Sequence, residues 1–83
     1  MVLIHLNTDQ LLDFYYQQLF DIIQVKDYFQ ARNRLIILTA NYNLYEEIHW
    51  HTIPDGLKHQ IREAISHTAD KVYAIGYLTP YGR

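Results

Sequence analysis

The stretch that most constrains the fold is residues 44–53, which holds the only tryptophan, two of the five histidines and an adjacent pair of glutamates. From Ile48 onward apolar and polar residues alternate, and such alternation predicts a half-buried strand. Ile48 and Trp50 would then face a core. The opposite face of this strand would carry Glu47, His49 and His51. Both the fold and the candidate site therefore depend on how this stretch folds.

The same stretch also carries signals for a helix. Asn43 followed by Glu46 matches a helix-capping pattern. Leu44, Tyr45 and Ile48 have the spacing of one helix face. The two interpretations lead to different folds, and both stay open at this point.

A helix is predicted from residue 11 to about residue 32, because apolar residues recur there with the helical period. Its expected core stripe is Leu12, Tyr15, Tyr16, Leu19, Ile22 and Ile23. Further apolar residues lie on the opposite side. A bend near Lys26 is therefore a second interpretation, with Asp27 and Gln30 capping a second short helix.

The rest of the chain is interpreted as strands and one more helix. Residues 2–6 form a short apolar run, and residues 35–38 are four consecutive apolar residues, typical of a strand covered on both faces. Pro54-Asp55-Gly56 marks a helix start, and that helix is expected to end near residue 67. Residues 71–78 alternate and predict the last strand.

This order of elements predicts an α+β fold, the ferredoxin-like βαββαβ plait, with a four-stranded sheet and two helices on one face. If residues 43–51 are helical, the alternative is a three-stranded parallel α/β sheet with three helices. With 83 residues, the chain (1–83) is expected to form a single domain. The expected core comprises Val2, Ile4, Leu19, Ile23, Leu35, Ile37, Ile48, Trp50, Leu57, Ile61, Ile65, Val72 and Ala74.

Composition narrows the classes of function. The absence of cysteine excludes disulfides, thiolate metal sites and a cysteine nucleophile. A net charge of −2 argues against a nucleic-acid partner. The 14% aromatic content is high for so small a core, so some rings should lie at the surface, where they suit an interface. A homodimer is therefore expected.

No apolar run approaches the length of a membrane span, and the first residues lack the basic region of a signal peptide. These observations predict a cytoplasmic protein without membrane contact. Only three glycines are present, and no phosphate-binding loop or catalytic motif occurs. No cofactor is therefore expected.

Histidines form the first candidate constellation. In the plait the first and third strands are neighbours, so His5 would lie near His49 and His51. Three imidazoles beside a carboxylate can bind zinc or carry out acid–base chemistry. Metal binding by His5, His49 and His51 is the weaker alternative here, because a His-x-His pair on a strand often occurs by chance.

Exposed rings form the second constellation. The open face of the sheet would gather the expected partner-binding residues Tyr45, His49, His51, Tyr73 and Tyr77. An uncovered face of this kind indicates a protein interface. The sequence therefore favours a non-enzymatic regulator or inhibitor that covers a partner protein. A phage or other mobile element is the guessed source, although no residue pattern encodes it. The alternative is a small His-dependent or metal-assisted enzyme that acts on nucleic acid.

Overall fold

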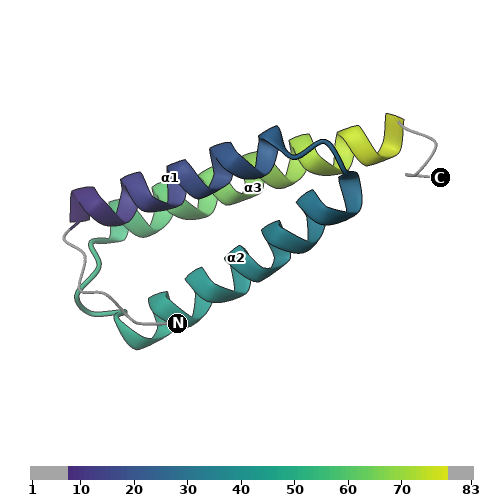
Figure 1. Cartoon of the computed structure of the whole chain (residues 1–83). Helices are drawn as coiled ribbons and strands as arrows, with labels where there is room; N and C mark the ends of the chain where they lie inside the picture. Colours follow the sequence, from purple (N-terminus) through teal and green to yellow (C-terminus); the bar gives the residue numbers. More distant parts are fainter. Residues whose placement is uncertain (1–7, 79–83) are drawn as a thin grey trace.

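The computed structural model describes residues 8–78, which form three α-helices (Figure 1). α1 spans Thr8–Gln24, α2 spans Tyr28–Ile48 and α3 spans Asp55–Leu78. α1 and α3 lie side by side, and α2 packs against them from one side. Because the described residues contain no strand, the predicted ferredoxin-like plait is wrong, and so is its three-stranded parallel alternative.

α1 packs against the core because its buried residues are spaced four, four and three positions apart, which places them on one side of the helix. The buried side chains on this helix are Leu11, Tyr15, Leu19 and Ile22. This stripe is close to the predicted one but rotated slightly. Leu12 and Ile23 lie at its edge, and Tyr16 is 46% exposed. The helical period was therefore read correctly, and the boundary of the buried face was not.

The connection between α1 and α2 confirms the alternative interpretation of a bend near Lys26. Asp27 has an extended backbone, and its side chain accepts a hydrogen bond of 3.1 Å from the Gln30 backbone N–H. This is the N-cap arrangement, which satisfies a backbone donor that the helix itself leaves unpaired. The second helix is not short, however, because it continues to Ile48.

α2 includes residues 35–38 and the first part of residues 44–53, which were both predicted as strands. Its core side is made by Ala31, Leu35, Leu38, Tyr42, Tyr45 and Glu46. These positions follow a three-and-four spacing along one face of the helix. Within the apolar run 35–38, Leu35 and Leu38 point to the core, whereas Ile36 and Ile37 are 51% and 68% exposed. A run of four apolar residues thus winds around a helix here and does not pass through a sheet.

α3 contacts both other helices through one continuous stripe. Its buried side chains are Leu57, Lys58, Ile61, Ile65, Thr68 and Val72. The predicted helix ending near residue 67 and the predicted strand 71–78 form one helix. No proline or glycine separates residues 67 and 71, so nothing in the local sequence ends the helix there.

The core differs from the expected one at several positions. Leu19, Leu35, Leu57, Ile61, Ile65 and Val72 are buried as predicted. The expectation was wrong for Ile37, Ile48, Trp50 and Ala74, which are exposed. Ile23 is partly buried, and Val2 and Ile4 lie outside the described residues. The errors follow from strand periodicity applied to helical segments.

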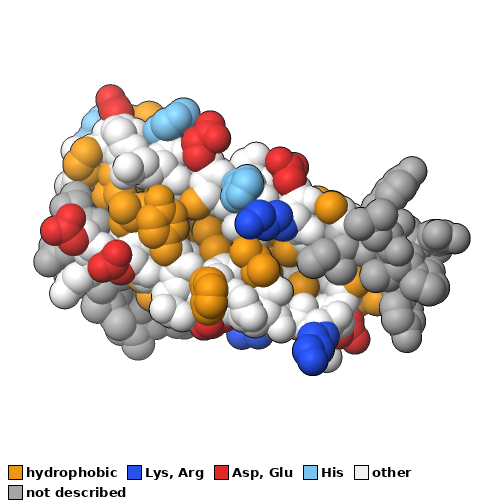
Figure 2. Space-filling model, turned by 90° about the horizontal axis from the view of Figure 1, so that it is seen from above, with side chains coloured by type: hydrophobic (Ala, Val, Ile, Leu, Met, Phe, Trp, Pro, Cys, Tyr) orange, Lys and Arg blue, Asp and Glu red, His pale blue; other side chains and the backbone are white. Residues whose placement is uncertain are grey.

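Large apolar side chains remain on the surface. Seen from above, over α1, apolar side chains gather in patches between polar ones (Figure 2). Between residues 8 and 78 no helix has both the length and the apolar character that a membrane span requires.

Candidate functional site

The candidate site lies where α2 ends and α3 begins. His49 is the C-cap of α2, and its backbone carbonyl accepts hydrogen bonds from the backbone N–H groups of Thr52 and Ile53, at 3.0 and 3.1 Å. The Thr52 hydroxyl also donates to this carbonyl at 2.9 Å. Ile53 is buried and fixes the turn to the core. The turn is therefore held in one conformation, and it places Trp50 beside α3.

Lys58 holds the Trp50 ring from the α3 side. Its ammonium group lies 3.3 Å from the centroid of the ring, donates to the Trp50 carbonyl at 3.1 Å and pairs with Asp55 at 3.1 Å. The residue is only 4% exposed. A buried ammonium group needs such partners, and a cation over an indole face adds attraction. Lys58 therefore has a structural role in positioning Trp50.

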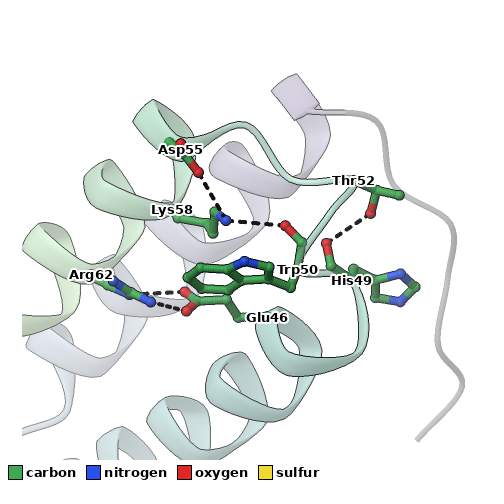
Figure 3. A network of polar contacts seen from close by, with 7 residues as sticks. All are labelled: Glu46, His49, Trp50, Thr52, Asp55, Lys58 and Arg62. Carbon is green, nitrogen blue, oxygen red and sulfur yellow. Dashed lines mark hydrogen bonds and ion pairs between the residues drawn. The ribbon is translucent and has the colours of Figure 1, made fainter.

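A bidentate ion pair lies next to this ring. Arg62 donates to both carboxylate oxygens of Glu46, with an Nε–Oε2 distance of 3.0 Å. Glu46 is 7% exposed, whereas about half of the Arg62 side chain is exposed. The Arg62 guanidinium also lies 5.7 Å from the centroid of the Trp50 ring. In Figure 3 the side chains of Glu46, Lys58 and Arg62 are gathered around Trp50.

The ion pair sets the charge states of this corner. Burial alone would raise the pKa of Glu46, but the hydrogen bonds and positive charge of Arg62 outweigh burial and hold that pKa below its usual value. Conversely, the hydrogen bonds to Glu46 raise the pKa of Arg62. Glu46 is therefore ionised at neutral pH. It is a poor candidate for a general acid, because its proton is lost too readily.

Behind the ion pair lies an aromatic layer. Tyr42 is fully buried, and its ring meets that of Tyr15 edge to face, with centroids 5.1 Å apart. Burial raises the pKa of Tyr42, and the negative charge of the adjacent Glu46 carboxylate raises that pKa further. The Tyr42 hydroxyl itself forms no hydrogen bond of ordinary geometry. Burial also raises the pKa of Tyr15 to about 12. Both phenols stay neutral at physiological pH, so their shifted values reflect packing in the core.

On the outer side the corner opens into a hollow of about 400 Å³. Its lining residues are Asn43, Glu46, Glu47 and Trp50. The Glu46 carboxylate is neutralised by Arg62, so the charge that the hollow offers to a ligand comes from Glu47, which is exposed. A carboxylate, an amide and an indole together suit a basic side chain, whose charged end pairs with the acid while its methylene stem packs on the ring.

The structure separates the partner-binding residues predicted from the sequence. Tyr45 is 8% exposed, and its ring centroid lies 4.5 Å from that of His49, which is half-buried. His51 is exposed in the turn beside Trp50. Tyr73 is exposed but lies about 27 Å along α3 from Asp55, the first residue of that helix, at ~1.5 Å per residue. The Tyr77 side chain lies outside the described residues, and residues 8–78 form no sheet face that could join the five.

The weaker metal alternative loses its geometric basis as well. It needed His5 on a strand beside His49 and His51, and His5 lies outside the described residues. Within the part of the chain that the structure describes, no three His, Asp or Glu side chains are grouped as metal ligands would be.

Sequence reasoning missed the cluster of Glu46, Lys58 and Arg62 around Trp50. A signal was present, because Glu46 and Trp50 are four residues apart, and so are Lys58 and Arg62. Residues at this spacing share a helix face. Trp50 follows the end of α2, however, and the two pairs come from different segments, so this spacing alone does not show that they meet. Comparison of the chain with protein-family models, curated proteins and solved structures found no match.

Proposed function

We propose that this protein is a non-enzymatic interaction module, which regulates or inhibits a partner protein by covering part of its surface. The main support for this proposal is the amount of apolar surface that the three helices leave exposed. Ten large apolar side chains of the described residues are between 40% and 68% exposed. Scattered apolar residues are normal on a surface, but gathered ones mark interaction sites.

The hollow beside Trp50 gives this surface a specific point of contact. Glu47 and Asn43 supply polar acceptors, and Trp50, which is 45% exposed, supplies the apolar wall. Tryptophan is among the residues most often found to carry binding energy in interfaces. The proposed partner therefore inserts a lysine or arginine side chain between Glu47 and Trp50. His51 follows Trp50 in the exposed turn and is retained from the expected contacts, and a contact through Tyr73 also stays a prediction.

The test is affinity capture from the source cells with two charge-reversed variants. Glu47→Lys places a positive charge at the hollow, and Glu63→Lys makes the same change at an exposed residue of α3 that does not line the hollow. Wild type and Glu63→Lys are expected to retain one protein partner in stoichiometric amount, and Glu47→Lys is expected to lose it. Circular dichroism of both variants should match wild type, because both positions are exposed.

Two results would contradict this function. Equal capture by Glu47→Lys and Glu63→Lys would remove the hollow as the contact. Recovery of nucleic acid without a protein partner would favour the alternative of a nucleic-acid-acting enzyme. His49→Ala then becomes the variant to assay for nuclease activity.

A further inference from the structure

α2 carries a second apolar stripe on the side opposite its core face. We call this the outer stripe; it consists of Phe29, Ile36, Ile37, Ala40, Leu44 and Ile48. At 100° per residue these positions centre on one side of the helix, and the buried residues centre on the other. In Figure 1 one side of α2 is turned toward α1 and α3, and the buried residues of α2 identify that side as its core face. Among the described residues, Phe29 contacts Tyr28 and Arg32, and the other large side chains of the stripe remain more than half exposed.

The stripe is large enough to form an interface. Its five large side chains are between 42% and 68% exposed. Together they present on the order of 500 Å² of apolar surface, the size of the largest patches on monomers. Burying such a stripe on each of two chains removes roughly 1,000 Å² from solvent, which reaches the lower limit for a specific interface.

The residues along the stripe favour an antiparallel second copy as the occupant. Arg32 and Arg34 flank its first half, and Glu47 lies within the stripe near its end, at the same helical angle as Phe29. In an antiparallel pair centred on Ala40, the basic half of one α2 faces the acidic end of the other. The exposed Ala40 at the centre lets two backbones approach closely. Around it, Ile36 of one chain meets Leu44 of the other.

We propose that two copies of this chain associate through the outer stripes of α2, antiparallel, about a two-fold axis that passes near Ala40. Such an interface is self-complementary and closed, so association stops at the dimer. The proposal leaves Trp50 to the partner site, but it uses five of the ten exposed apolar side chains on which the proposed function rests. Glu47 belongs to both surfaces, so the tests of self-association use other residues.

The first test measures mass in solution. The chain has a mass of 10.0 kDa, so light scattering of the purified protein should give about 20 kDa at micromolar concentration. Ile37→Lys should weaken association at least ~30-fold, because two-fold symmetry places the unpaired charge in the interface twice. Phe20→Lys is the matched control, since Phe20 is 59% exposed on α1 and outside the stripe. A monomeric wild type, or equal loss in both variants, would overturn the proposal.

The second test fixes the orientation and exploits the absence of cysteine from the chain. Ala40→Cys should give a disulfide-linked dimer on mild oxidation, because residues on the axis lie within bonding range. Ile36→Cys and Leu44→Cys should crosslink when mixed, but neither should crosslink alone. Crosslinking of Ile36→Cys with itself would indicate a parallel pair and contradict the proposed arrangement. Failure of partner capture would leave these results unaffected.

Discussion

Replacement of Ile61 by alanine should strongly destabilise the bundle. Ile61 is 0% exposed and lies on the buried stripe of α3, the helix that contacts both others. The change removes three buried carbon groups, worth about 0.8 kcal/mol each in transfer alone. A cavity forms as well, because close-packed neighbours relax only partly. The expected loss is therefore about 3 kcal/mol, within the usual ~2–5 kcal/mol for this substitution.

Such a loss is large for a chain of this size. At ~0.05–0.15 kcal/mol per residue, the whole domain has a free energy of unfolding of roughly 4–12 kcal/mol. Each kcal/mol shifts the melting temperature of so small a domain by about 4–8 °C, so Ile61→Ala should melt roughly 12–24 °C lower. Urea titration followed by circular dichroism gives the free energy directly.

The matched control is Ile37→Ala, the same chemical change at a side chain that is 68% exposed. At concentrations low enough to keep the chain monomeric, it should alter stability by less than ~0.5 kcal/mol. Any further destabilisation that appears only at higher concentration belongs to association. A loss below ~1 kcal/mol for Ile61→Ala would refute the packing described for α3.

Two further predictions concern the ends of α2. Asp27→Ala should cost ~0.5–2 kcal/mol in urea titration, because it removes the cap on the Gln30 N–H, and an unchanged midpoint would contradict that role. Glu46 has a folded pKa below its ordinary value of 4.5, so its contribution to stability is complete above about pH 4.5 and is lost as the pH falls through the folded value. Acid titration of Glu46→Gln should show less loss of stability over this range than wild type, and identical pH profiles would contradict the assigned ionisation.

Local signals in the sequence predicted part of the fold correctly. The stripe along α1 and the cap at Asp27 depend on residues only three or four positions apart, so they can be recognised without knowledge of the tertiary structure. Residues 35–38 cannot be assigned in this way, because a run of four apolar residues fits a covered strand as well as a helix exposed on two sides. Assigning residues 35–38 to a helix required knowing that Ile36 and Ile37 remain on the surface.

The site around Trp50 shows why function was harder to reach than secondary structure. Alternation after Ile48 placed the Trp50 ring in a core, but α2 ends at Ile48, and the following turn leaves the ring at the surface. Its neighbours Lys58 and Arg62 come from the next helix. Their charges are tolerated there because the Trp50 carbonyl and Glu46 satisfy them. A single helix displays only half of such a cluster, so the site becomes visible only when the crossing of α2 and α3 is known.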